Sequence, residues 1–493
     1  MELKIRILKW SAGVPVAMLN EGTAEKLGVH LRDRISIKIN SHELFTIVDT
    51  VGKLVKENEI AVSSEIKERL NLYQGQKVDV NLANYPESLN FIKDKLNGKR
   101  LSRKQIDAII KDIADNSLSE SEIALFVSGM YKNKMNFSET ISLINAIVNS
   151  GSKLNFKSKL IADKHCIGGI PGNRTTPIIV SICASAGLTM PKNSSRAITS
   201  AAGTADVIEA IAKVEFTPIQ IKKIVKKTNA CIVWGGALEL VPADSKIIQI
   251  EKQLKIDPEA QMIASIFAKK LAVNSNYILI DIPYGKFAKV SKENALKIKG
   301  KFEKIGKYFH KHVKAVLTKG DEPIGNGIGP IMELIDIVRV LDNKQESPRD
   351  LEEKSLFLSG QLLEMTGKAK KGQGYILAKE ILCSGRAFEK FKDIIKAQEG
   401  KPEKLLRLKK SNYFKDIFSK KTGKIIEINN KKINSLALVA GCPVDKKAGL
   451  YLYHHLGEKI LKSDKILTIY AESKSRIKEA IKFYKIEKPI KIS

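Results

Sequence analysis

Residues 164–176 bring together the residue types that bind anions. The segment reads Lys-His-Cys-Ile-Gly-Gly-Ile-Pro-Gly-Asn-Arg-Thr-Thr. Its glycines allow backbone N–H groups to approach an anion, and its lysine and threonines supply charge and hydroxyl donors. A P-loop is excluded because, counting from Gly168, the positions that need the second glycine and the lysine hold Asn173 and Arg174. By itself the segment predicts a tight turn between a strand and a helix equally well.

A second segment of this kind covers residues 193–209. It reads Asn-Ser-Ser-Arg-Ala-Ile-Thr-Ser-Ala-Ala-Gly-Thr-Ala-Asp-Val-Ile-Glu, so small and hydroxyl residues follow Arg196, apart from Ile198. The pattern then predicts a helix with Thr204 as its N-cap. Donors at a helix N-terminus suit a phosphate group. The alternative is a loop that packs closely against a sheet.

The pattern around both segments predicts an α/β lobe. Between about residues 160 and 340, strands, glycine turns and helices alternate, which favours a mostly parallel sheet with its loops gathered at one end. Residues 230–234 and 277–282 read as buried strands. A helix is expected to start at Thr217-Pro218, with proline at its first position.

The rest of the chain predicts further domains, giving an α/β multidomain protein. Residues 1–84 alternate with period two and indicate an N-terminal β-barrel, with a short helix over 23–27. Residues 85–160, with part of 250–275, indicate a helical lobe. Ser119 and Glu122 form a capping box there, and similar patterns follow Ser102 and Ser138. Residues 161–420 form the α/β phosphate-binding lobe, and 421–493 a β-rich C-terminal domain of α+β type.

The composition narrows the possible binding partners and cellular compartment. The 493 residues include 84 Lys and Arg against 54 Asp and Glu, a net charge of +30. Lysine is spread along the chain and aromatics make up only 6%, so a nucleic-acid surface is disfavoured. The first explanation for the positive charge is solvation of the surface, and the second is attraction of anionic substrates. The most apolar stretch is too short to span a membrane. Five scattered cysteines and isolated histidines predict a reducing cytoplasm and no metal site.

Together the two segments resemble the thymidine/pyrimidine-nucleoside phosphorylase family. That family's phosphate loop reads Lys-His-Ser-x-Gly-Gly, and its signature reads Ser-Gly-Arg, six residues, then Gly-Thr-x-Asp-x-x-Glu. Residues 263–270 and 322–327 resemble two further family motifs, so the resemblance covers about 85–490. This chain has Cys166 where the family usually has serine. The positions that match the signature are Ser194, Arg196, Gly203, Thr204, Asp206 and Glu209.

Two departures resemble one branch of the family, the archaeal AMP phosphorylases. These are the Ala-Ile-Thr-Ser-Ala-Ala run after Arg196 and the extra N-terminal barrel. The resemblance implies phosphorolysis of AMP to adenine and ribose 1,5-bisphosphate, with CMP and UMP as further candidate substrates, in a salvage route that feeds Rubisco. It implies two lobes facing each other across a cleft and a homodimer or larger homo-oligomer. Inorganic phosphate would be the co-substrate, with no cofactor.

The resemblance also carries site residues over by position. Asp257, eight residues before Ser265, matches the proton donor; the alternative is that it only caps a helix beginning at Pro258. Ser265 would contact the base, and Lys289 the phosphate of the substrate. The residues implied for AMP binding are Gly169, Ser195, Arg196, Ala197, Ile198, Thr199, Ser200, Thr204, Ser265 and Lys289. Those implied for inorganic phosphate are Lys164, Thr176 and Ser194, with Thr204 matching both sets.

Three alternatives stay open at this point. A pyrimidine-nucleoside phosphorylase would act on thymidine or uridine and need no 5′-phosphate site. A phosphoribosyltransferase of similar fold would need a diphosphate leaving group and Mg²⁺. A basic nucleic-acid-binding protein would use the N-terminal barrel and bind in a salt-sensitive way.

Overall fold

The computed structural model describes the chain except residues 9, 12–14, 41, 198–199, 239 and 344–345. The chain divides into two compact units. The first comprises Met1–Ser150 and Pro242–Ser265, and the second Gly151–Val241 and Ile266–Ser493. None of the helices among the described residues is both long and apolar enough to cross a membrane.

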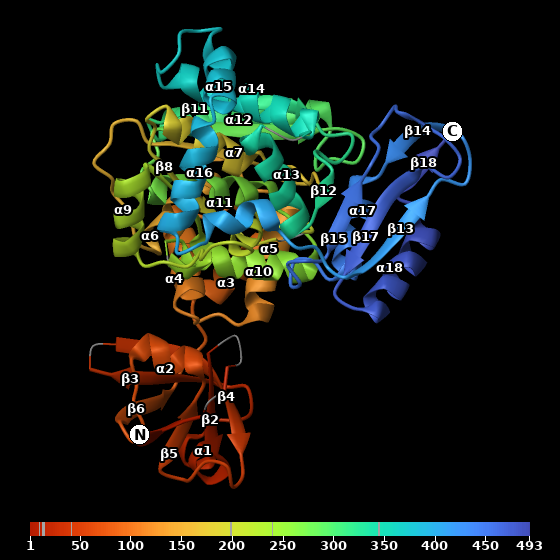
Figure 1. The fold of residues 1–493 in the computed structure, drawn as a ribbon. Helices are drawn as coiled ribbons and strands as arrows, with labels where there is room; N and C mark the ends of the chain where they lie inside the picture. Colours follow the sequence, from red (N-terminus) through yellow and green to blue (C-terminus); the bar gives the residue numbers. More distant parts are fainter. Residues whose placement is uncertain (9, 12–14, 41, 198–199, 239, 344–345) are drawn as a thin grey trace. The chain divides into compact units, whose positions relative to one another are not determined.

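The first unit begins with the expected barrel (Figure 1, red to orange). Its six strands close in the order β1-β5-β2-β4-β3-β6. Alternate side chains, such as Leu3 and Ile5, are buried inside, as the period-two pattern predicts. The elements are β1 (Glu2–Ile7), β2 (Val16–Asn20), α1 (Glu21–Leu27), β3 (Arg34–Ile39), β4 (His42–Val51), β5 (Glu59–Val62), α2 (Ser64–Leu70) and β6 (Lys77–Leu82).

Helices make up the rest of the first unit. Capping boxes at Ser102 and Ser119 start two of them, as predicted. The third does not begin after Ser138; its cap is Asn136, whose side chain accepts the N–H of Glu139 at 2.9 Å. The helices are α3 (Ser88–Leu96), α4 (Arg103–Ala114), α5 (Glu120–Asn133), α6 (Phe137–Asn149), α10 (Pro242–Leu254) and the start of α11 (Glu259–Ala272).

The second unit contains the parallel sheet that carries both anion segments. Its strands are β7 (Ala162–Cys166), β8 (Met190–Ser194), β9 (Ala230–Trp234), β10 (Tyr277–Tyr284) and β11 (His312–Lys319). The pairs β11-β10-β7 and β8-β9 are all parallel, and a bridge between Ile161 and Thr189 extends the sheet from β7 towards β8. Because parallel strands end at the same edge, the loops after Cys166 and Ser194 lie at that edge.

Helices cover this sheet and bury an apolar core that includes Ile178, Ile232 and Leu279. Helix α9 starts at Pro218 behind a capping box at Thr217, as expected. The helices are α7 (Thr175–Ser185), α8 (Thr204–Glu209), α9 (Pro218–Thr228), α12 (Lys292–Tyr308), α13 (Pro330–Asp342), α14 (Arg349–Met365), α15 (Gly374–Cys383) and α16 (Arg386–Ala397), with short 3₁₀ turns at Gly235–Leu238 and Pro402–Arg407.

The C-terminal part (Figure 1, blue) has two small antiparallel sheets, ordered β12-β15-β17-β13 and β16-β14-β18. Strand β12 comes from the loop after β11, so the larger sheet includes a strand from the α/β region. Two helices, α17 and α18, add to the short strands and turns expected from the sequence. The elements are β12 (Gly327–Ile328), β13 (Tyr413–Phe418), β14 (Gly423–Ile428), α17 (Asn430–Ala440), β15 (Gly449–Leu452), β16 (Lys459–Ile460), β17 (Lys465–Ala471), α18 (Lys474–Glu487) and β18 (Ile490–Ile492).

Candidate functional site

The first anion segment, residues 164–176, connects the end of β7 to the start of α7. Gly168 and Gly169 have φ values of +91° and +92°, which residues with a side chain rarely adopt. No side chain caps the N-terminus of α7, and the first turn of this helix holds no acidic residue. The positive end of its dipole is therefore suited to an anion, and the buried Thr176 lies in that turn.

Two lysines face one carboxylate beneath this segment. The Nζ of Lys164 donates to Thr175 Oγ1 at 2.8 Å and lies 3.7 Å from Asp281 Oδ2, while Lys354 Nζ lies 3.2 Å from the same oxygen. Burial alone would raise the pKa of Asp281, but the two lysines outweigh it and hold the pKa below its usual range. Burial lowers the pKa of Lys164. A bound anion would stabilise both ammonium groups.

Lys354 was missed in the sequence analysis. It lies in the middle of α14, far along the chain from Lys164, and no motif marks it. Only the packing of α14 against β10 brings it to Asp281.

His165 lies among further lysines. Lys192 and Lys270 both bind Asp163, at 3.1 and 2.7 Å. Burial and then the charge of Lys270 hold the pKa of His165 well below its usual range, so its imidazole is neutral at neutral pH. The Nδ1 atom of His165 is buried with no hydrogen-bond partner among the described residues. A neutral imidazole is a weak acid, which disfavours His165 as the proton donor.

Cys166 stabilises the turn from inside. Its Sγ accepts hydrogen bonds from the N–H of Gly168 at 3.4 Å and from Asn173 Nδ2 at 3.3 Å. Burial raises the pKa of Cys166, so it remains a thiol. The sulfur therefore joins the two arms of the turn as an acceptor.

The second anion segment begins at the end of β8, whose last residue is the buried Ser194. Arg196 is held by Glu209 at 2.5 Å and Glu215 at 2.8 Å, and its guanidinium lies 4.1 Å from the ring centroid of Trp234. Its charge is therefore already paired. Ile198 and Thr199 lie outside the described residues. Ser195 and Ser200 are partly exposed, and Ser200 Oγ donates to the carbonyl of Ala202 at 2.9 Å.

The prediction that Thr204 caps α8 is wrong. The N-cap is Gly203, which has an extended backbone and whose N–H is accepted by Asp206 at 2.8 Å. Thr204 is the first residue of a helix of only six residues. Its hydroxyl oxygen accepts instead from Arg174.

Arg174 joins the two anion segments. Its guanidinium donates to Thr204 Oγ1 at 3.2 Å and to the carbonyl of Ala202 at 2.7 Å, and its Nε pairs with the buried Glu333 at 2.5 Å. The segments are therefore neighbours in the fold, although about thirty residues separate Arg174 from Thr204. In the sequence, Arg174 stood out only as a mismatch to a P-loop.

Lys289 and Gly169 are also brought together. A Cβ atom on Gly169 would lie 3.1 Å from the Cβ of Lys289, which is tighter than most Cβ contacts, and the φ of +92° also favours glycine here. Lys289 is exposed, and its Nζ donates to the carbonyl of Ile167 at 3.3 Å. Its ammonium group thus lies at the first anion segment.

Asp257 and Ser265 belong to the first unit, whereas both anion segments belong to the second. Ser265 Oγ donates to the buried Asp244 at 2.9 Å, and Gln261 Nε2 donates to the other oxygen of Asp244 at 3.0 Å. Asp257 is exposed in the turn before α11, which begins at Glu259 and not at Pro258.

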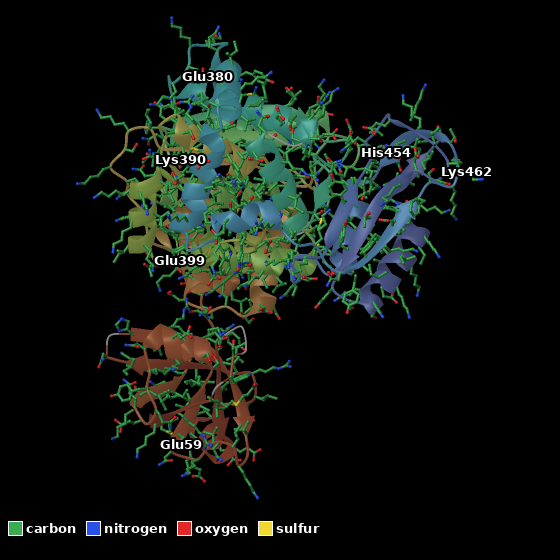
Figure 2. The ribbon with its side chains drawn as sticks, viewed as in Figure 1. Glu59, Glu380, Lys390, Glu399, His454 and Lys462 are labelled. Carbon is green, nitrogen blue, oxygen red and sulfur yellow. The ribbon has the colours of Figure 1, made fainter. Side chains whose placement is uncertain are left out.

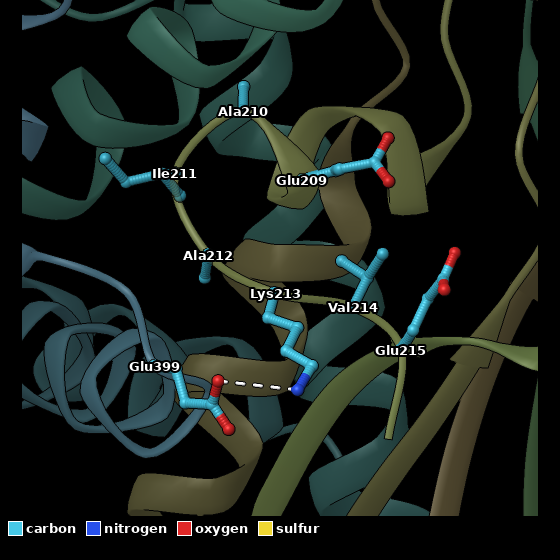
Figure 3. A pocket seen from close by; sticks show the side chains of 8 residues that line it. All are labelled: Glu209, Ala210, Ile211, Ala212, Lys213, Val214, Glu215 and Glu399. Carbon is cyan, nitrogen blue, oxygen red and sulfur yellow. Dashed lines mark hydrogen bonds and ion pairs between the residues drawn. The ribbon is translucent and has the colours of Figure 1, made fainter. Parts of the chain in front are cut away.

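An open pocket of about 560 Å³ in the second unit lies next to the end of the second anion segment, at Glu209 (Figure 3). Glu209, Glu215 and Glu399 line it, together with Lys213, which pairs with Glu399 at 3.4 Å. None of the predicted site residues lines this pocket. It is therefore not the predicted site, although two of its glutamates hold Arg196.

The described residues contain no group of three or more His, Cys, Asp and Glu side chains placed to hold a metal ion. His454, at the surface of the C-terminal part (Figure 2), bonds to Glu458 at 3.1 Å. Its neighbour His455 bonds to Glu322 at 3.1 Å.

Known protein families match three parts of the chain. The helical bundle domain of a glycosyl transferase family matches residues 89–151, and the a/b domain of that family matches residues 158–388. The C-terminal domain of pyrimidine nucleoside phosphorylases matches residues 424–493.

A solved structure, the anthranilate phosphoribosyltransferase of Thermus thermophilus, is similar with a TM-score of 0.53. It covers 63% of this chain and 99% of its own length at 16% sequence identity, which shows a shared fold alone.

Full-length relatives are more similar in sequence. The AMP phosphorylase of Pyrococcus furiosus is 41% identical over all of this chain and 98% of its own length. That of Methanospirillum hungatei is also 41% identical, over all of this chain and 96% of its own. That of Methanococcoides burtonii is 40% identical over 99% of this chain and 97% of its own. Such identity along the whole length, barrel included, shows that the chain belongs to the AMP phosphorylase family.

Proposed function

We propose that the protein cleaves AMP by phosphorolysis and releases adenine and ribose 1,5-bisphosphate. The structural observation that supports this most is the position of Arg174, which belongs to the first anion segment and donates hydrogen bonds to the second. An enzyme that acts on a nucleoside needs only one phosphate site, which holds the attacking phosphate. An enzyme that acts on a nucleotide needs a second site nearby for the 5′-phosphate. The names of the full-length relatives point to the same reaction.

Inorganic phosphate is proposed to bind Lys164 and Thr176 of the first segment and Ser194 at the start of the second, next to the lysine pair at Asp281. Phosphate attacks C1′ of the ribose on the face opposite the base. A bond from a phosphate oxygen to C1′ forms, the bond from C1′ to N9 breaks, and configuration inverts. The transition state has oxocarbenium character, so a phosphate dianion beneath the sugar stabilises it electrostatically.

The second segment and Lys289 are proposed to hold the nucleotide. Ser195, Ser200 and Thr204 supply hydroxyl groups, and Lys289 supplies a charge beside Gly169. Arg196 is paired with two glutamates, so we assign it to shaping the segment and not to direct charge pairing with the 5′-phosphate.

Asp257 is proposed to donate a proton to the adenine ring nitrogen, because a purine leaves poorly as an anion. Ser265, oriented by Asp244, is proposed to contact the base. These residues belong to the first unit and the anion segments to the second. Excluding water from the site would prevent water from attacking C1′ in place of phosphate.

We further propose a cytoplasmic homodimer or larger homo-oligomer that needs no cofactor, with CMP and UMP as additional substrates. Free cysteines at all five positions suit a reducing compartment.

The test is an assay of the purified protein with inorganic phosphate and AMP, adenosine, CMP, UMP, thymidine or uridine, with free base and sugar phosphate both measured. Phosphate-dependent release of adenine and ribose 1,5-bisphosphate from AMP, unchanged in EDTA, is the expected result. Faster turnover of thymidine or uridine than of AMP would identify a pyrimidine-nucleoside phosphorylase instead. A need for Mg²⁺ and diphosphate would identify a phosphoribosyltransferase.

A further inference from the structure

The C-terminal part of the chain fixes the backbone of the second anion segment. We name residues 194–197 and 200–204 the serine segment. Contacts reach it at three places: at its two ends, through Asp206, and near its middle, at Ala201. Two residues beyond position 430 take part: Asn434 accepts the N–H of Ala201, and Lys446 pairs with Asp206.

Asp206 closes the ends of the serine segment. One of its carboxylate oxygens accepts the N–H of Ala197 at 2.7 Å and the N–H of Gly203 at 2.8 Å. A Cβ atom on Gly203 would lie 2.6 Å from the carbonyl of Ser195, so only glycine allows the ends to meet this closely. The carboxylate is almost fully buried, which leaves it dependent on these donors and on one nearby cation.

That cation is Lys446, from the turn between α17 and β15. Its Nζ lies 3.5 Å from the second oxygen of Asp206 and 2.7 Å from Glu209. Glu209 also holds Arg196. Lys446 therefore pairs both with the carboxylate that accepts the N–H groups of the segment and with one that holds Arg196.

Asn434, on α17, fixes the middle. Its side-chain oxygen accepts the N–H of Ala201 at 3.1 Å, and this contact is buried. Ala201 is 1% exposed and packs into the apolar core of the C-terminal part. The neighbouring Ser200, one of the proposed nucleotide contacts, is positioned by this anchor.

We propose that Asn434 and Lys446 are positioning residues for the 5′-phosphate, so that the C-terminal part of the chain sets the preference for nucleotides over nucleosides. The inference rests on the proposed function. Hydroxyl and N–H groups bind a phosphate tightly only when their directions are fixed before binding. Because the charge of Arg196 is already paired, this fixed geometry takes the place of a free arginine.

The test compares N434A and K446M with the unchanged protein, using AMP and adenosine. Loss of the anchor is expected to raise KM for AMP about tenfold, with KM for phosphate and kcat/KM for adenosine changed less than about twofold. Where adenosine turnover is too slow to measure, the dissociation constants of AMP and adenosine give the same ratio. A merely structural role would lower the melting temperature and weaken both ligands equally.

Matched controls come from the same region. Asn430 is a buried asparagine on the same helix, but it donates to the carbonyl of Gly320 and not to the serine segment. Lys432 pairs with Glu487 at 3.2 Å, away from the segment. N430A and K432M should leave the ratio of AMP to adenosine unchanged. Lys446 is 28% exposed, so K446M tests the idea even if N434A does not fold.

An unchanged AMP-to-adenosine ratio in K446M and in folded N434A would overturn the inference. So would an equal shift in the controls. If the unchanged protein does not phosphorolyse AMP, the proposed function itself fails, and that outcome is visible before any variant is made.

Discussion

The two anion segments have similar compositions but are stabilised in different ways. The first is a turn between a strand and a helix, with buried lysines beneath it and an uncapped helix N-terminus at its end. The second has its arginine paired with glutamates and is fixed by Asp206, Asn434 and Lys446. If each segment binds a phosphate group as proposed, the first would attract it by charge and the second would bind it through fixed hydroxyl and N–H groups. Residues of similar type do not by themselves reveal which of these operates.

The largest loss of activity is expected from a change at Asp257, which belongs to neither anion segment. If both only hold phosphate groups, the proton for adenine must come from outside them. Asp257→Asn keeps the size of the side chain but removes that proton, so kcat for AMP should fall at least about 100-fold, roughly 2.7 kcal/mol of barrier. KM should change little, because the loss belongs to the transition state.

Steady-state kinetics on AMP measure this, with Glu259→Gln at the start of α11 as the control. Near-normal turnover by D257N would contradict the assignment of Asp257 as the proton donor and leave it with a structural role before α11.

The next effect separates the two segments by ligand. Lys354→Met removes one of the two ammonium groups at Asp281, so KM for inorganic phosphate should rise about tenfold while AMP binding stays within about twofold. The surface residue Lys390 (Figure 2) provides the control, K390M. Initial rates at varied phosphate and fixed AMP measure the change. A rise in KM for AMP instead would mean that Lys354 serves the other segment.

A smaller effect tests the hydroxyl groups of the second segment. Ser200→Gly removes one hydroxyl, so AMP should bind several-fold more weakly, as expected from the loss of about 1 kcal/mol for one hydrogen bond. Adenosine, which lacks the 5′-phosphate, should bind as before. Calorimetric titrations with both ligands decide this, and equal losses would show that Ser200 does not read the phosphate.

The smallest effect concerns stability and pH. Gly172 packs against the carbonyl of Ile324, in a loop whose N–H groups at Asn326 and Gly327 are accepted by Asp336. Burial raises the pKa of Asp336 from 3.8 to about 7. The native state therefore binds a proton that the unfolded state releases, and this contribution to stability, complete below pH 3.8, is lost as the pH rises through 7.

Melting temperatures between pH 5 and 8.5 test this for the unchanged protein and for Asp336→Asn. The variant should gain stability relative to the unchanged protein as the pH rises. A difference that does not vary with pH would contradict the raised pKa.

The sequence predicted the features that depend on neighbours along the chain. The turn after Cys166, the strand over 230–234, the capping box at Ser119 and the helix start at Thr217-Pro218 are local patterns, and the structure contains them. The caps at Ser138 and Thr204 were wrong because a nearby residue, Asn136 or Gly203, forms the better cap.

The supporting residues of the site could not be predicted in this way. Lys354, Asp281 and Asn434 come from distant helices and strands, and their roles follow only from tertiary packing. Arg174 was visible in the sequence, but nothing local shows that it reaches Thr204.

Strand β12 has a consequence for how this protein can be divided. Its two residues leave the α/β region and pair with Leu450 and Tyr451, where Ile328 is fully buried. A cut between residues 388 and 424, where the two family matches stop and start, would remove the partner of this strand and expose Ile328 to water. Backbone hydrogen bonds between β12 and β15 therefore connect the two regions that the family matches separate. Exchange of the C-terminal part between relatives, in evolution or by design, would have to carry a matching β12 with it.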